Sequence, residues 1–136
     1  MQKVRAALRM SAEGEEELLE AEGTCSLSAA GERLYRFAAE GGHFFVRAGA
    51  CVRIERRGGI AYAFDWQPLA ETPARIATPY GEIAAAVYTH ALECGERDGA
   101  FRIAADYELR AGGQAQRRFA ELRFVPAAGG RGGARS

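Results

Sequence analysis

Apolar and polar residues alternate along most of this chain, and this two-residue period constrains the fold more than any other feature. Successive side chains of a β-strand point to opposite faces, so alternation predicts a strand with one buried face. In the stretch 101–110, Phe101 and Ile103 share one face, and Arg102 and Asp106 share the other. The same period places further apolar residues on common faces near both ends of the chain: Val4, Ala6, Leu8 and Met10, then Ala120, Leu122 and Phe124. The chain is therefore expected to be mainly antiparallel sheet.

Two hairpins follow from this pattern. The strands 101–110 and 117–125 flank a turn at 111–114, which contains two glycines. In the middle of the chain, a three-residue loop at 57–59 would set Ile54 against Tyr62 and keep apolar residues opposite each other. Gly59 is free to take the left-handed conformation that such a loop requires.

Other segments are less clear from periodicity. The stretches 15–22 and 82–93 are rich in helix formers but also fit strands, and the residues alone leave both undecided. Pro68 and Pro73 predict a loop over 67–75, because proline cannot donate to a central strand.

Turn chemistry and composition set the boundaries of the domain. Thr78-Pro79-Tyr80-Gly81 predicts a type I turn, with proline at the second position and glycine at the fourth. The low-complexity sequence of 127–136 predicts a disordered tail, so a single domain is expected over 1–126.

Length, charge and cysteines narrow the class of protein. A chain of 136 residues suits one domain with one core. Its 18 basic and 18 acidic side chains cancel, which argues against nucleic acid or a membrane surface as a partner. The amino-terminal sequence lacks the apolar core of a signal peptide, and the three cysteines form no Cys-x-x-Cys pair. We expect reduced thiols in a cytoplasmic protein.

Several short motifs resemble a known family. They are Arg56-Arg57-Gly58, then Thr78-Pro79-Tyr80-Gly81 with a strand that ends near Thr89, then Gly99 and the alternating strand through Asp106. Together they make the chain from Val4 to Val125 similar to the YwiB-like bacterial family, domain of unknown function 1934. The resemblance implies an all-β fold, a calycin-like (lipocalin-like) antiparallel up-and-down barrel of about eight to ten strands. It implies strands for both undecided segments, but it implies no activity, so no catalytic residue is carried over from the family.

Motifs for catalysis, cofactors and metals do not emerge from the residues. On a strand, His90 and Cys94 would lie about 13 Å apart, too far for one ion. Cys25 has no evident activating neighbour and is expected to be a small buried residue. The paired glycines fit hairpin turns rather than a phosphate-binding loop. We expect no cofactor and no metal, and an enzyme only of unrecognised type.

The remaining candidates are arginines and aromatic residues. An anion-binding patch could involve Arg53, Arg56, Arg57, Arg117 and Arg118, but interleaved acids favour an ordinary solvated exterior. The aromatic residues would either line a cavity or fill the barrel: Phe44, Tyr62, Phe64, Trp66, Tyr80, Phe101, Tyr107, Phe119 and Phe124.

The function that fits these observations best is non-enzymatic binding of a small amphipathic or apolar ligand. The expected ligand-binding residues are Arg56, Tyr62, Trp66 and Tyr80, near one mouth of the barrel. Arg56 would either orient the ligand or close the mouth. The alternatives are a filled barrel that serves as a structural or interaction protein, as monomer or homodimer through a surface such as Phe45, and an enzyme. A connected cavity would favour ligand binding.

Overall fold

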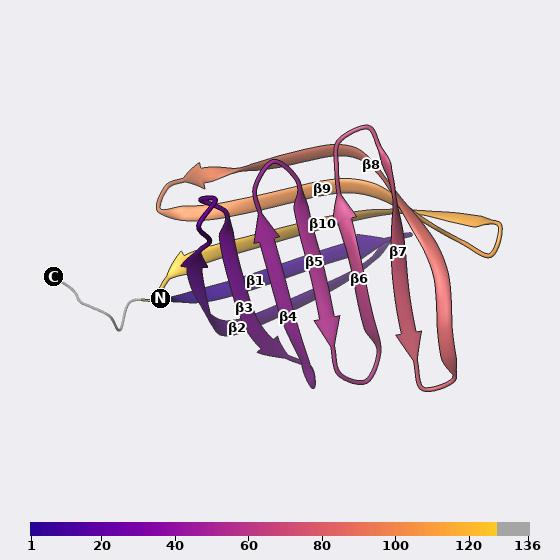
Figure 1. The fold of residues 1–136 in the computed structure, drawn as a ribbon, viewed down its shortest axis with the longest axis horizontal. Coiled ribbons are helices and arrows are strands. Elements are labelled where there is room, and N and C mark those ends of the chain that lie inside the picture. Colours follow the sequence, from indigo (N-terminus) through magenta and orange to yellow (C-terminus); the bar gives the residue numbers. More distant parts are fainter. Residues whose placement is uncertain (128–136) are drawn as a thin grey trace, which may run out of the picture.

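The computed structural model describes residues 1–127, which form ten antiparallel strands in one closed barrel. Each strand pairs with its neighbours in sequence, and β10 closes onto β1 (Figure 1). The strands are β1 (Gln2–Ala12), β2 (Glu15–Leu27), β3 (Arg33–Ala39), β4 (Gly42–Ala48), β5 (Val52–Arg57), β6 (Ala61–Trp66), β7 (Glu71–Thr78), β8 (Gly81–Arg97), β9 (Ala100–Ala111) and β10 (Gln114–Pro126). The expected calycin-like, up-and-down barrel is confirmed. Of the tail predicted to be disordered, only Ala127 lies within the described residues, and its amide donates to the carbonyl of Lys3.

The barrel has two layers of strands that cross steeply. Figure 1 shows β3 to β7 running across β1, β9 and β10. The long strands β2 and β8 turn the corners between the layers. The first part of β2 pairs only with β1, and pairing with β3 begins at Gly23. Likewise, β8 pairs with β7 up to Tyr88 and with β9 from Ala86 onward. Two corners are thus closed by continuous strands, as in orthogonally packed sheets.

Both segments that favoured helix by composition are strands. Glu15–Glu22 lies in β2, where Glu22 pairs with Arg5 and Glu16 lies 3.8 Å from Arg9. Basic residues on β1 thus lie across from acidic residues on β2, and such cross-strand pairs stabilise a sheet. The intrinsic helix propensity, a few tenths of a kcal/mol per residue, is overridden by tertiary pairing.

The predicted register of the β5–β6 hairpin is wrong by two residues. Ile54 pairs with Phe64 rather than with Tyr62, and Arg56 pairs with Tyr62. The three-residue loop is therefore 58–60 instead of 57–59, although Gly59 does take a positive φ of 47°. A shift of two residues keeps every side chain on its predicted face. It also brings Trp66 opposite Val52, which adds a fully buried apolar pair.

The loop predicted over 67–75 is only partly correct, because β7 already begins at Glu71. Pro73 pairs with Ala86 on β8, whereas pairing of β7 with β6 extends no further back than Arg75. The side of β7 that faces β6 is therefore unpaired at Pro73, and a strand tolerates proline where no hydrogen bond from its nitrogen is needed. The turn at 78–81 is confirmed: Thr78 pairs with Gly81, and the Thr78 hydroxyl accepts a hydrogen bond from the Tyr80 amide at 3.1 Å.

A β-bulge interrupts β8 between Thr89 and Ala91. Thr89 is fully buried, Ala91 is exposed, and Leu92 packs against the core. Regular alternation of this strand would place Ala91 on the inner face with Thr89. The extra residue, His90, shifts the inward series by one position and increases the local twist at the barrel corner.

Aromatic side chains fill much of the interior. Tyr35 on β3 stacks on Phe124 of β10, with 3.7 Å between ring centroids and 7° between planes. Trp66 packs against Tyr107 at 5.4 Å, and both are buried. These contacts join the two layers directly and make up the filled part of the barrel.

Candidate functional site

The barrel is hollow at one end. A cavity of about 610 Å³ lies at the end where the turns between β1 and β2, β3 and β4, and β5 and β6 are located. Most of its walls are apolar, and its charged groups come from four different segments. The lining residues are Leu8, Met10, Glu17, Leu19, Glu40, Phe44, Arg56, Ile60, Tyr62, Phe64, Ile76, Leu109 and Arg118.

Arg56 holds two turns together at the mouth of this cavity. Its guanidinium donates to the carbonyl of Gly58 at 2.8 Å, to the carbonyl of Ile60, and to the carbonyl of Glu40 at 3.2 Å. A Cβ atom on Gly42 would lie 2.8 Å from the Arg56 guanidinium carbon, so glycine leaves the space that this side chain occupies. Arg56 thus ties the β3–β4 turn to the β5–β6 loop.

Two phenols lie on the inner face near the cavity. Tyr62 lines the cavity, opposite Arg56, and burial raises its pKa to about 12, with the Arg56 and Arg118 charges opposing the shift. Tyr107 is buried opposite Arg118, and burial likewise raises the pKa of its phenol. Both groups are therefore neutral near pH 7 and available as hydrogen-bond donors.

The predicted site residues separate into two groups. Arg56 and Tyr62 lie together at the cavity. Trp66 is fully buried in the filled part of the barrel, and Tyr80 is 99% exposed at the tip of the β7–β8 turn, so neither lines the cavity. The structure therefore does not bring these two residues to the cavity: Trp66 lies at the opposite end of β6 from Tyr62, and Tyr80 is exposed on the turn between β7 and β8.

Sequence reasoning did not place Glu17, Leu19 or Arg118 at the cavity, although it named Arg118 in a possible anion-binding patch. The first two lie in the segment that helix propensity left undecided. Arg118 carried a usable signal, since it shares the alternating face of Ala120 and Leu122 and must point inward with them. Its neighbour Arg117 points outward and pairs with Asp106.

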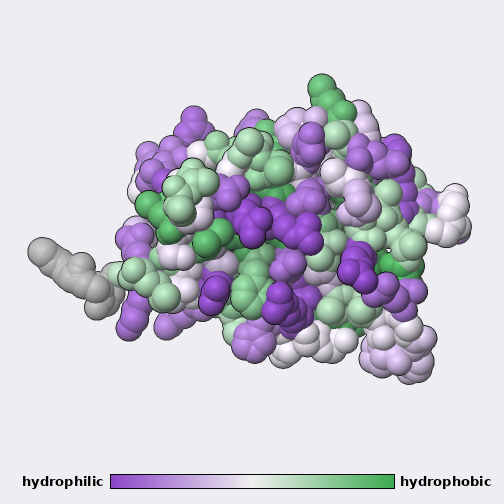
Figure 2. Space-filling model, in the orientation of Figure 1, coloured by the Kyte–Doolittle hydropathy of each residue, from purple (hydrophilic) through white to green (hydrophobic). Residues whose placement is uncertain are grey.

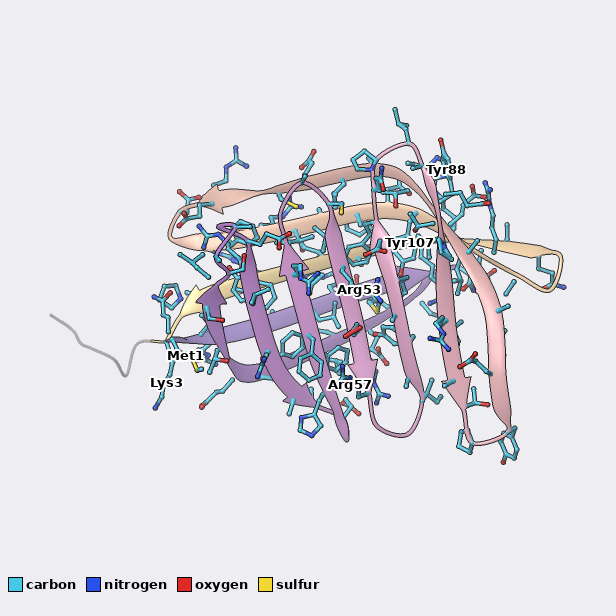
Figure 3. The ribbon with its side chains drawn as sticks, in the orientation of Figure 1. Met1, Lys3, Arg53, Arg57, Tyr88 and Tyr107 are labelled. Atoms are coloured by element: carbon cyan, nitrogen blue, oxygen red, sulfur yellow. The ribbon has the colours of Figure 1, made fainter. Side chains whose placement is uncertain are left out.

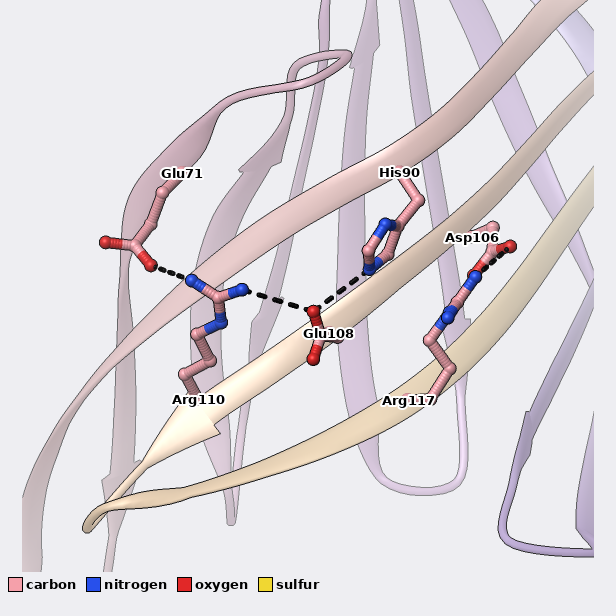
Figure 4. Close-up of polar contacts among 6 residues, drawn as sticks. All are labelled: Glu71, His90, Asp106, Glu108, Arg110 and Arg117. Carbon is pink, nitrogen blue, oxygen red and sulfur yellow. Dashed lines mark hydrogen bonds and ion pairs between the residues drawn. The ribbon is translucent and has the colours of Figure 1, made fainter.

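The outer face carries a dense set of ion pairs. Figure 4 shows a chain in which Glu71 pairs with Arg110 at 2.6 Å, Arg110 with Glu108 at 3.1 Å, and Glu108 with His90 at 3.0 Å. Hydrogen bonds from His90 and Arg110 lower the pKa of Glu108. These contacts link β7, β8 and β9 beside the bulge and leave the carboxylates charged, so they fit a structural role at the corner.

The two outward arginines of β5, Arg53 and Arg57, are also engaged. Arg53 and Arg57 extend from β5 on the face turned toward the viewer in Figure 3, and both pair with Glu55. The Arg57 guanidinium lies 4.8 Å from the Phe45 ring centroid and shields that aromatic side chain. Hydrophilic side chains gather across the centre of this face in Figure 2. The sequence-based interpretation of these arginines as a solvated exterior agrees with this arrangement.

Residues 1–127 include no group of three or more His, Cys, Asp or Glu side chains arranged to hold a metal ion. Over the same residues, the chain has no helix that could cross a membrane.

The fold and the hollow end define the class: a calycin-like, closed up-and-down β-barrel with a cavity that opens at one end. Residues 8–122 match the family described as a domain of unknown function, DUF1934, and the chain belongs to that family. Among solved structures, it is similar to the ywiB protein from Bacillus subtilis, with 14% identity, a TM-score of 0.72, and coverage of 93% of this chain and 91% of that one. That likeness concerns the fold. No curated protein matches the chain.

Proposed function

We propose that this protein is a non-enzymatic, cytosolic binding module that takes a small amphipathic or apolar ligand into its cavity. The cavity carries the proposal. Its volume of about 610 Å³ falls within the range of ligand pockets, roughly 300–1,000 Å³. Its walls combine apolar side chains with a few polar groups at one end, which is the composition expected of a small-molecule site.

The chemistry of the lining favours binding over catalysis. Tyr62, with its pKa raised to about 12, stays protonated at neutral pH and so suits hydrogen-bond donation better than proton transfer. Arg56 is committed to three main-chain carbonyls, which supports a role in closing the mouth around a ligand. The three free cysteines, Cys25, Cys51 and Cys94, support a reducing compartment.

The alternative of a filled barrel that acts through an outer aromatic surface is less well supported. Phe45, the expected exterior anchor, has the guanidinium of Arg36 at 5.7 Å and that of Arg57 at 4.8 Å from its ring centroid. A partner would have to displace both arginines to reach the ring.

Two neighbouring leucines on β2 allow a matched test. Leu19 lines the cavity, whereas Leu18 is 56% exposed on the outside. Binding of the neutral fluorescent probe N-phenyl-1-naphthylamine should be saturable in the wild type and in Leu18→Trp. It should be at least about tenfold weaker in Leu19→Trp, because the larger indole projects into the cavity and takes space from the probe.

Circular dichroism and thermal unfolding of both variants establish that each remains folded. The proposal is wrong if the wild type shows no saturable binding of the probe, or if a folded Leu19→Trp binds it as tightly as Leu18→Trp does.

A further inference from the structure

Arg118 is an unusual arginine in this barrel because it points inward. It lies on β10 directly opposite Tyr107 of β9 and on the same face as the buried Ala120. It is half-buried and lines the cavity. A guanidinium in this position cannot lose its charge, so it needs either a partner or access to water.

The outward-pointing arginines nearby have carboxylate partners. Arg117 binds Asp106 through two hydrogen bonds of 2.6 and 2.9 Å, and Arg102 pairs with Glu121. Arg118 has no carboxylate partner within residues 1–127, and its Nε donates to the side-chain oxygen of Gln116 at 2.6 Å. Its terminal nitrogens, which carry the paired donors suited to a carboxylate, remain without an acidic partner in this part of the chain.

Arg56, which also lines the cavity, differs from Arg118 because its donors already have main-chain partners. The Arg56 donors go to the carbonyls of Gly58, Ile60 and Glu40. The two lining carboxylates, Glu17 and Glu40, are both exposed, while Arg118 is half-buried beside the fully enclosed ring of Tyr107. The polar end of the cavity therefore carries charges of both signs, and Arg118 is less exposed than Glu17 and Glu40.

The phenol of Tyr62 completes this polar end, and Tyr107 lies buried behind it. Tyr62 stacks on Phe64 at 5.5 Å, and Phe64 lies 5.9 Å from Tyr107, so the three rings form one continuous wall. The charge of Arg118 opposes the effect of burial on the pKa of both phenols, whereas the Glu17 carboxylate adds to that effect on Tyr62. One guanidinium and a neutral phenol at the same end of an apolar cavity are the donors that a single carboxylate head group needs.

We propose that the cavity is specific for a monocarboxylate with an apolar tail, whose head group binds Arg118 and Tyr62 while the tail lies against Leu8, Phe44 and Leu109. This inference rests on the proposed binding function and names its ligand class. A singly charged head group fits better than a phosphate dianion, because Glu17 and Glu40 at the rim repel additional negative charge.

The test compares two ligands of equal tail length, decanoate and decanol, as competitors for N-phenyl-1-naphthylamine at neutral pH. Decanoate is kept below its micellar concentration and decanol below its solubility limit. In the wild type, decanoate should displace the probe at a concentration about ten to a hundred times lower than decanol does. Arg118→Met should abolish that preference, measured as the ratio of the decanoate and decanol concentrations that displace half of the probe from the same variant. Arg118→Lys keeps the charge but loses the planar pair of donors, so it should retain part of the preference for decanoate over decanol.

Arg117→Met is the matched control, because the neighbouring side chain points outward and pairs with Asp106. It should keep the full preference for decanoate. If the probe binds but decanoate competes no better than decanol, or if the preference survives in Arg118→Met, the carboxylate inference is wrong and the general binding function stands. Failure of the wild type to bind the probe at all would instead overturn both.

Discussion

Gly23 on β2 lies so close to Arg36 on β3 that a Cβ atom at Gly23 would be 2.2 Å from the Arg36 carbonyl oxygen. The same atom would be 2.9 Å from the Cβ of Phe37. This close approach occurs where β2 leaves one layer of the barrel and begins to pair with the next, so the absence of a side chain permits the corner.

Gly23→Ala should therefore destabilise the protein by about 1–3 kcal/mol, the usual cost of overpacking a close contact. Urea unfolding followed by circular dichroism measures the difference. Gly95→Ala is the control, since a Cβ on Gly95 meets no atom within 4 Å, and it should leave the free energy of unfolding unchanged or slightly higher. Equal stabilities of the two variants would show that the β2 corner can relax without cost.

Arg56→Met should lower the free energy of unfolding by about 1–2 kcal/mol, because three main-chain carbonyls lose a charged donor. Arg57→Met, in the adjacent outward position with a 69% exposed side chain, should change stability by less than about 0.5 kcal/mol. Hydrogen exchange at the amides of the β3–β4 turn and the β5–β6 loop would report the same difference locally. Unaltered exchange in Arg56→Met would contradict the role assigned to this side chain.

Thr89→Val should be neutral or stabilising by up to about 1–2 kcal/mol, because the fully buried Thr89 hydroxyl has no hydrogen-bond partner in the structure. The Thr72 hydroxyl, by contrast, donates to the carbonyl of Asp65 at 2.9 Å. Thr72→Val should accordingly cost about 1 kcal/mol. Chemical denaturation of both variants compares them directly, and a larger loss in Thr89→Val than in Thr72→Val would show that the Thr89 hydroxyl is satisfied in solution.

Alkaline pH should destabilise the protein through its buried phenols. The pKa of Tyr62 rises to about 12 because burial disfavours the phenolate, whereas an unfolded tyrosine titrates near 10. A raised folded-state pKa means that the contribution is fully present below pH of about 10 and is lost as pH rises toward 12. Tyrosinate absorbance should show a late step that Tyr62→Phe diminishes and Tyr80→Phe leaves in place. Absence of a late step in the wild type, or a late step that Tyr62→Phe leaves unchanged, would contradict the burial of the Tyr62 phenol in solution.

Alternation was sufficient to predict strands and their inner faces wherever it was regular. In β1, β9 and β10, the residues expected inside are buried or packed against the core, including Leu8, Ile103 and Leu122. The family resemblance supplied what alternation lacked in the two helix-favouring segments. The two-residue alternation of β10 also predicts that Arg118 faces inward. Only the closed barrel shows that this face adjoins a cavity.

Other features depended on interactions that are distant in sequence. Two registers of the β5–β6 hairpin that differ by two residues keep the same side chains on the inner face, so the local sequence does not distinguish them. The observed register buries Trp66 against Tyr107, a contact with a distant strand. The bulge at His90 arises where β8 passes from pairing with β7 to pairing with β9, which no local pattern reveals.

The sequence by itself determined that this chain is sheet, which side chains face inward along regular strands, and where its tight turns fall, because these properties follow from neighbouring residues. Only the tertiary structure decided that one end of the barrel is filled by Trp66 and Tyr107 while the other is hollow around Tyr62 and Arg118. The physical reason is that the volume left inside a closed sheet depends on how side chains from all its strands meet, and that sum is not encoded in any single segment.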